Sequence, residues 1–242
     1  MPKKVVQEAE RRRRRPTRQG TVVSEKLIVQ TALRILREHG SAGLTARRLG
    51  AALGADPSTL YRYFAGLDGL TRAIGEELMG RALDSWTATG TWRSDLHALG
   101  LAIHSSYLAH PQAAVLTASR VTGRPREIEV DETILGILRT AGFGDADAVG
   151  IYHAFIDLAL AFAALDAGAL TIKDEVREAD EDMWTSTYAR LPAATHPHIA
   201  ATAHLLADRM NRSAYPVVLD TLLHRAEARL LVATHGRTTG TE

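Results

Sequence analysis

Residues 44–64 read LTARRLGAALGADPSTLYRYF, and this stretch decides how the first part of the chain folds. Apolar residues recur near helical spacing in its first half, and Thr45 offers a hydroxyl that can accept a hydrogen bond from an unpaired N–H at a helix start. Gly54 tolerates the positive φ that follows a helix end, while Asp56 and Pro57 supply a cap and a preset first turn. The stretch therefore predicts two short helices joined by a tight turn, which is a helix-turn-helix layout.

The second of these helices is expected to carry a polar and aromatic surface. Leu60 and Phe64 lie four residues apart and can anchor it inward. The side chains expected to be exposed are Ser58, Thr59, Tyr61, Arg62 and Tyr63. The alternative is an ordinary helical hairpin with the aromatic residues in its core, but that interpretation leaves the arginines of the stretch without a role.

A further helix is expected ahead of this pair. Residues 22–39 have an amphipathic pattern, with Ser24 or Thr21 as the cap and Gly40 as the stop. We expect this helix to pack behind the pair and support it.

The charge of the chain is divided unevenly along its length. The formal net charge is +1, yet residues 1–20 hold eight Lys or Arg against two Glu. Residues 71–242 hold 15 basic and 22 acidic side chains. A basic end and an acidic body favour the binding of nucleic acid through the basic end.

Composition divides the chain into four segments. Residues 1–20 lack apolar periodicity and include five consecutive arginines, so we expect a flexible basic arm. Residues 21–67 form the predicted helix-turn-helix domain, residues 68–234 a larger helical domain, and residues 235–242 a disordered tail. The arm is expected to contact DNA through Arg14, Arg15 and Arg18; the alternative is a solvated tail that only aids solubility.

The larger domain is also predicted to be helical, which makes the fold class all-α. Pro and Gly turns separate the helices, and strand-like alternation is nowhere sustained. The expected helices cover residues 68–86, 94–110, 112–121, 125–141, 145–170, 197–211 and 214–234. Residues 171–195, which mix acidic side chains with Trp184 and Tyr188, are the expected long loop.

Several functional classes are disfavoured by composition. The chain has no cysteine, so it forms no disulfide and no zinc finger. It has no uninterrupted apolar run of about 18 residues, so we expect no membrane span and a cytoplasmic protein. The histidines lack acidic partners at the spacing of a known metal motif, and we expect no metal and no cofactor.

The helix-turn-helix stretch resembles that of the tetracycline-repressor (TetR) family. Members usually read Leu-Thr, a basic pair, Leu-Ala, then Gly, then Thr-Leu-Tyr-x-His/Tyr-Phe. The body resembles the core domain of the tetracycline repressors in the segments TWRSDLHALG, SRVTGRP, AGFGDADAV and YPVVLDTLLHRAEARL. The resemblance implies a transcriptional repressor that binds a palindromic operator in double-stranded DNA as a homodimer and is released by a small-molecule effector.

The resemblance also implies which side chains contact DNA. Arg47 is the candidate for a bidentate contact to guanine, and Ser58, Thr59 and Arg62 lie on the groove side of the second helix. Tyr61 and Tyr63 pair with phosphates through their hydroxyls. Thr45 and Arg48 are flanking candidates, with a solvated surface charge as the alternative for Arg48. Leu67 departs from the family, because many members have a phosphate-binding lysine there.

Two helices are candidates for a dimer interface. The apolar run from Ile156 and the final helix are apolar over a wider face than one helix needs, and the resemblance implies a four-helix interface between two copies. Packing within one chain is the alternative.

The resemblance further implies an effector pocket among the body helices. The candidate residues are Leu99, Ile103, Tyr107, Leu116, Thr133, Ile137, Tyr152 and Ile156, with core packing as the alternative role. His153 and Asp157 form a same-face polar pair that could orient a ligand. Leu116 replaces the metal-ligating histidine of tetracycline binders, and Leu83 and Leu99 replace polar drug contacts. We therefore expect a more apolar effector than magnesium-tetracycline.

No catalytic motif is visible in the sequence. It contains neither a nucleophile elbow nor a phosphate-cradling glycine loop, so we do not predict an enzyme. The alternative to a DNA-binding regulator is an all-helical small-molecule-binding protein or enzyme without operator binding.

Overall fold

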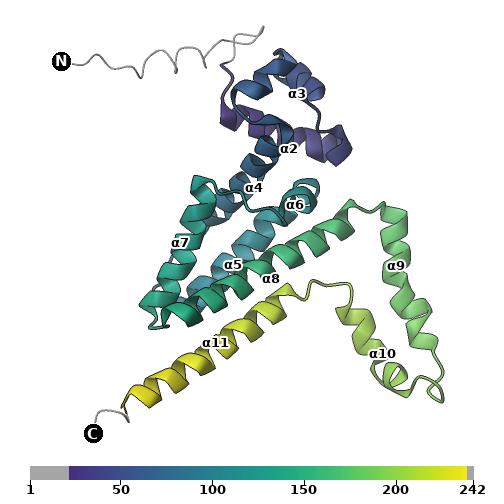
Figure 1. Ribbon diagram of the computed structural model, residues 1–242. Coiled ribbons are helices and arrows are strands. Elements are labelled where there is room, and N and C mark those ends of the chain that lie inside the picture. Colours follow the sequence, from purple (N-terminus) through teal and green to yellow (C-terminus); the bar gives the residue numbers. More distant parts are fainter. Residues whose placement is uncertain (1–21, 239–242) are drawn as a thin grey trace.

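The computed structural model describes residues 22–238, with side chains to residue 232. This part of the chain is all-α and contains no β-strand, as predicted (Figure 1). The head comprises α2 (Glu25–His39), η1 (Ser41–Gly43), α3 (Ala46–Leu53) and η2 (Pro57–Arg62). The body comprises α4 (Gly66–Ser85), α5 (Trp92–Leu108), α6 (Pro111–Thr117), α7 (Pro125–Thr140), α8 (Asp145–Thr171), α9 (Asp174–Ser186), η3 (Tyr188–Arg190), α10 (Pro197–Arg209) and α11 (Tyr215–Thr238).

The helix ends in the head are fixed by the residues that the sequence singled out. Ser24 caps α2 by accepting a hydrogen bond from a backbone N–H at 3.2 Å, and Gly40 ends the helix with φ 66°. Thr45 caps α3 in the same way at 3.2 Å, and Gly54 ends it in the left-handed region with φ 63°. These caps satisfy terminal N–H groups that the helices leave unpaired, and the predicted boundaries are confirmed.

The turn between α3 and η2 is tightly packed. Asp56 accepts a hydrogen bond from the N–H of Ser58 at 2.8 Å and begins η2, which is a 3₁₀ helix. Gly50 faces this turn, and a Cβ there would lie 2.9 Å from the carbonyl oxygen of Ala55 and 3.0 Å from the nitrogen of Pro57. Only a residue without a side chain lets α3 approach the turn this closely.

The body is built around α8. This helix packs against α5, α6, α7 and α11, while α4 connects the head to α5, α6 and α7. Its inward face is lined by Phe155, Ala159 and Ala163, each 0% exposed, and the small alanines let neighbouring helices come close. The buried side chains of head and body form one continuous core.

Within the described residues, α8 is the one helix long and apolar enough to cross a membrane by length and composition. No membrane span was predicted, because the sequence has no uninterrupted apolar run of about 18 residues; within α8, Asp157 and Asp166 interrupt the run. A core helix of a soluble protein passes the same test, and α8 has four helical neighbours in this fold.

The prediction of a long loop over residues 171–195 is wrong. The segment forms α9 and η3, which project with α10 as an arm from the body (Figure 1). Asp174 and Glu175 in the first turn of α9 complement the helix dipole, and Arg177 pairs with Asp174 at 2.8 Å and Glu181 at 3.2 Å. No residue of α9 is buried, so hydrophobic periodicity gave no signal for it.

Candidate nucleic-acid interface and ligand site

The head carries an exposed basic and aromatic surface on α3 and η2. The side chains of Arg47, Ser58 and Arg62 are exposed, and Tyr61 is 66% exposed. Guanidinium groups and hydroxyls are the donors that contact guanine edges and phosphates. The exposure of these four side chains agrees with the predicted DNA-contacting roles.

Two flanking candidates also hold the local structure together. The hydroxyl of Thr45 accepts from the N–H of Arg48, and the guanidinium of Arg48 donates to the carbonyl of Gly43 at 3.1 Å. Both side chains are exposed, so each can still meet a phosphate while it supports the start of α3.

Two side chains that were expected to be exposed are not. Thr59 is only 6% exposed, because the 3₁₀ geometry of η2 turns it inward beside Leu60. Tyr63 is half-buried, and its hydroxyl donates to the backbone carbonyl of Val23 at 2.8 Å. The inward anchors Leu60 and Phe64 are buried as predicted, at 3% and 5% exposed.

The predicted DNA contacts of the basic arm lie outside the described residues. These are Arg14, Arg15 and Arg18.

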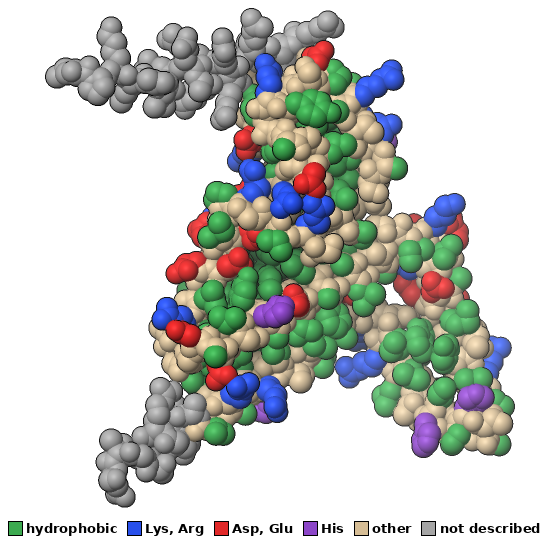
Figure 2. Space-filling view, viewed as in Figure 1, with side chains coloured by type: hydrophobic (Ala, Val, Ile, Leu, Met, Phe, Trp, Pro, Cys, Tyr) green, Lys and Arg blue, Asp and Glu red, His purple; other side chains and the backbone are tan. Residues whose placement is uncertain are grey.

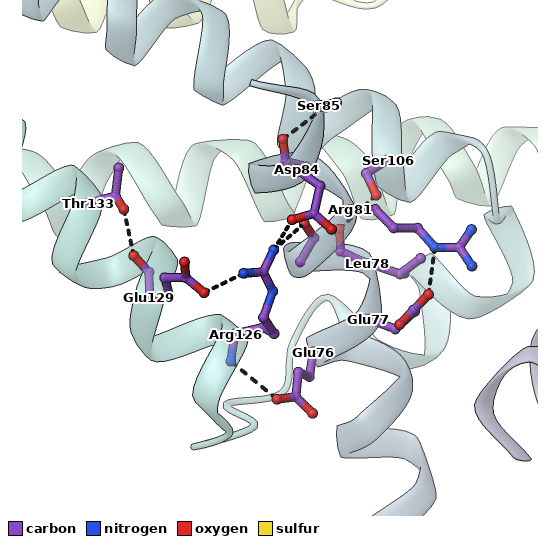
Figure 3. Close-up of polar contacts among 12 residues, drawn as sticks. Glu76, Glu77, Leu78, Arg81, Asp84, Ser85, Ser106, Arg126, Glu129 and Thr133 are labelled. Atoms are coloured by element: carbon purple, nitrogen blue, oxygen red, sulfur yellow. Dashed lines mark hydrogen bonds and ion pairs between the residues drawn. The ribbon is translucent and has the colours of Figure 1, made fainter. Parts of the chain in front are cut away.

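Ion pairs connect the head to the body. Arg124, just before α7, contacts Glu25 at the start of α2 at 3.1 Å and also pairs with Glu76 of α4. Its neighbour Arg126 pairs with Glu129 within α7, and it also binds Asp84 and the carbonyl of Gly80 on α4 (Figure 3). The two contacts with α4 hold α7 against that helix. The position of α7 is thereby tied to the helix that carries the head.

The predicted pocket residues lie on α5, α6, α7 and α8. Leu99 and Ile103 are 0% exposed and Tyr107 is 2% exposed, so all three are core residues here. The candidates that pack half-buried against this core are Leu116, Ile137, Tyr152 and Ile156. Thr133 uses its hydroxyl within α7, donating to the carbonyl of Glu129 at 2.7 Å.

A polar pair that the sequence analysis missed lies between α7 and α8. The hydroxyl of Tyr152 is hydrogen-bonded to the carboxylate of Asp131, and burial raises the pKa of both groups. The nearby Glu127 raises the pKa of Asp131 further. The signal available in the sequence was weak, because one acidic residue on an amphipathic helix is usually solvated.

The His153–Asp157 pair exists but does not join the other pocket candidates. Its ring nitrogen and carboxylate are 3.1 Å apart, and the two side chains are 75% and 69% exposed. Both residues therefore lie on the outward face of α8, apart from the buried pocket candidates, and the suggestion that the pair orients a ligand stays a prediction. Among the described residues, no group of three or more His, Asp or Glu could hold a metal ion.

A helix-turn-helix head on a larger helical body is typical of one class of proteins, the DNA-binding transcriptional regulators. The model for bacterial regulatory proteins of the tetR family matches residues 28–74, and that for the tetracyclin repressor-like C-terminal domain matches residues 86–229. The chain belongs to the TetR family, as its resemblance predicted.

Individual relatives agree with this assignment. An HTH-type transcriptional regulator of Saccharopolyspora erythraea is 27% identical over 138 residues, which are 56% of this chain and 58% of that relative, so less than two thirds of its length is matched. The class C tetracycline repressor protein of Escherichia coli is 26% identical over 178 residues, 71% of this chain and 77% of the relative.

Solved structures share the fold. A protein of Streptomyces coelicolor A3(2), described as a possible TetR family transcriptional regulator, is 30% identical with a TM-score of 0.71, covering 85% of this chain and 99% of its own. BioQ, solved with its natural double-stranded DNA operator, is 31% identical with a TM-score of 0.54, covering 61% of this chain and 88% of its own.

Proposed function

We propose that the chain is a repressor that binds a palindromic operator as a homodimer and leaves it when a small effector binds the body. The observation that carries the proposal is the exposed surface of Arg47, Tyr61 and Arg62 on a helix-turn-helix head. The BioQ structure, whose operator is bound by a related chain, supports the DNA-binding part.

The outward faces of α8 and α11 support a dimer. On α8, exposed residues recur every four positions, in the order Val149, His153, Asp157, Ala161, Leu165 and Ala169. Leu165 is 68% exposed, and on α11 Val217 is 63% and Val232 74% exposed. A second copy would cover these apolar side chains, and two heads on a two-fold axis would require a palindromic site.

The proposed effector site lies among α5, α7 and α8, where the candidate side chains pack together. Its side chains are mostly apolar, with Tyr152 and Asp131 as a hydrogen-bonding pair at its edge. A small apolar effector that binds one arrangement of these helices more tightly than another would shift the head through α4 and α7. The proposal includes no catalytic step.

Selection of duplexes from a random DNA library by the purified chain tests the DNA-binding part. We expect a palindromic site whose affinity falls steeply with salt, because phosphate contacts release counterions. Arg62→Ala should lower the affinity, while Arg34→Ala, an exposed change on α2 of the same head, should leave it nearly unchanged. Enrichment of no sequence, or an equal effect of both substitutions, would refute the proposal.

A further inference from the structure

A cavity lies at the junction of the head and the body. Its volume is about 210 Å³, and its walls come from α2 of the head, the turn between α5 and α6, and the C-terminal end of α8. Most of this wall is apolar and is formed by Leu33, Leu36, Ala113 and Leu170. A dry apolar cavity of roughly 150 Å³ can bind benzene, so a ring-sized ligand fits here.

The polar groups of this head–body cavity are cationic or neutral. Arg37, His110 and Gln112 line it, and none of its described lining residues carries a carboxylate. The guanidinium of Arg81 donates to Nε2 of His110 at 2.7 Å and is itself paired with the carboxylate of Glu77 at 2.9 Å. Burial, assisted by Arg81 and Arg37, lowers the pKa of His110. His110 is therefore held neutral and Arg81 is neutralised by Glu77, so the positive charge that favours an anion at this cavity is that of Arg37.

Arg37 is the arginine that lines the cavity. It lies in the last turn of α2 with an exposed side chain, and the neighbouring acidic residue Glu38 already pairs with Arg34 at 3.5 Å. A guanidinium at the edge of an apolar cavity can bind a carboxylate with two parallel hydrogen bonds.

We propose that the head–body cavity is a second small-molecule site, specific for a monocarboxylic acid with an apolar body about the size of a benzene ring. The apolar body lies against Leu33, Leu36 and Leu170, and the carboxylate accepts hydrogen bonds from Arg37. The site is distinct from the proposed effector site, because it shares no lining residue with it.

The position of this cavity couples it to the head. A ligand that contacts both α2 and the body stabilises the head position seen in this structure. It therefore changes the affinity for operator DNA if the head takes a different position when bound to DNA. By linkage, operator DNA then changes the affinity for the acid by the same factor. This consequence rests on the proposed function, whereas binding of the acid does not.

Calorimetric titration of the full chain with benzoate tests the site, with benzyl alcohol as the uncharged probe of the same shape. We expect a saturable one-to-one isotherm for benzoate and binding at least about tenfold weaker for benzyl alcohol. Arg37→Gln should weaken benzoate binding about tenfold. Arg34→Gln, a matched change on the same helix outside the cavity, should leave it unchanged.

A cavity-filling variant locates the site. Ala109 lines the cavity with an exposed side chain, so Ala109→Phe should fold and remove benzoate binding. No saturation at millimolar benzoate, equal binding of benzyl alcohol, or unchanged binding by Ala109→Phe would each overturn the proposal. If benzoate binds as expected but no operator is selected, the proposed function fails and the site stands.

Discussion

The hydroxyl of Tyr63 donates a hydrogen bond to the backbone carbonyl of Val23, 2.8 Å away and 40 residues earlier in the chain. This contact ties the end of η2 to the segment that leads into α2. A side chain expected to reach a phosphate thus holds the helix-turn-helix together.

Tyr63→Phe should therefore destabilise the head as well as weaken operator binding. Loss of the hydroxyl leaves a part-buried carbonyl without this partner, and we expect a cost of about 1 kcal/mol in the free energy of unfolding. Denaturant titration measures it. Tyr61→Phe is the control, because the exposed Tyr61 should affect DNA affinity alone; equal stability of the two variants would contradict the structural role of Tyr63.

Gly50→Ala should destabilise the head by steric overlap. The added methyl would lie 2.9 Å from the carbonyl oxygen of Ala55, and the backbone of the turn must move, at a cost of roughly 1–3 kcal/mol. Gly136→Ala in α7 is the matched control, since a Cβ there meets nothing within 4 Å. It should raise stability by about 0.5–1 kcal/mol, because alanine is the better helix former. Thermal melting of both variants decides the outcome, and a stabilised Gly50→Ala would refute the close approach.

Leu165→Glu should convert the proposed dimer to a folded monomer. A carboxylate on the outward face of α8 cannot be buried against a second copy without a partner, so association should weaken at least tenfold, or by about 1.4 kcal/mol. Light scattering after size-exclusion chromatography reports the mass. Val121→Glu is the control, because Val121 is 78% exposed but lies outside α8 and α11. A dimer that persists in Leu165→Glu would exclude this face.

Asp131→Asn should stabilise the protein at neutral pH and have a smaller effect in acid. Burial, and then Glu127, raises the pKa of Asp131, so the folded state holds the proton more tightly than the unfolded chain does. The folded state is therefore most stable in acid with respect to this group. Its free energy of unfolding falls as pH rises from the ordinary aspartate pKa of about 3.9 through the raised pKa. Unfolding measured across this range tests the sign, with Asp157→Asn on the exposed face as the comparison. A difference that grew as pH fell would contradict it.

The sequence predicted the head well because its signals are local. Ser24, Gly40, Thr45 and Gly54 act on the backbone within a few residues of themselves, and a cap or a positive φ can be recognised without knowing the tertiary structure. The all-α class and most helix boundaries followed from the same kind of signal.

Features that depend on distant contacts were not predictable. The orientation of Thr59 depends on the 3₁₀ form of η2, and the bond of Tyr63 depends on where Val23 lies. The Asp131–Tyr152 pair and the head–body cavity require the packing of α7 on α8 and of α2 on α6. The projecting arm was missed for another reason, since α9 buries no side chain and so has no core-facing pattern.

That arm has a thermodynamic consequence of its own. Ala203 is the one buried residue of α10, and hydrophobic side chains such as Val176, Met183 and Leu205 are 43–53% exposed along the arm (Figure 2). Local unfolding of the arm therefore exposes little additional apolar surface to water and costs little free energy. Its amide protons should exchange with solvent by local opening, far faster than those of α5 or α8, and proteases should cut it first. We therefore expect global unfolding to report on the head and the core helices as one cooperative unit, while the arm unfolds and refolds independently of them.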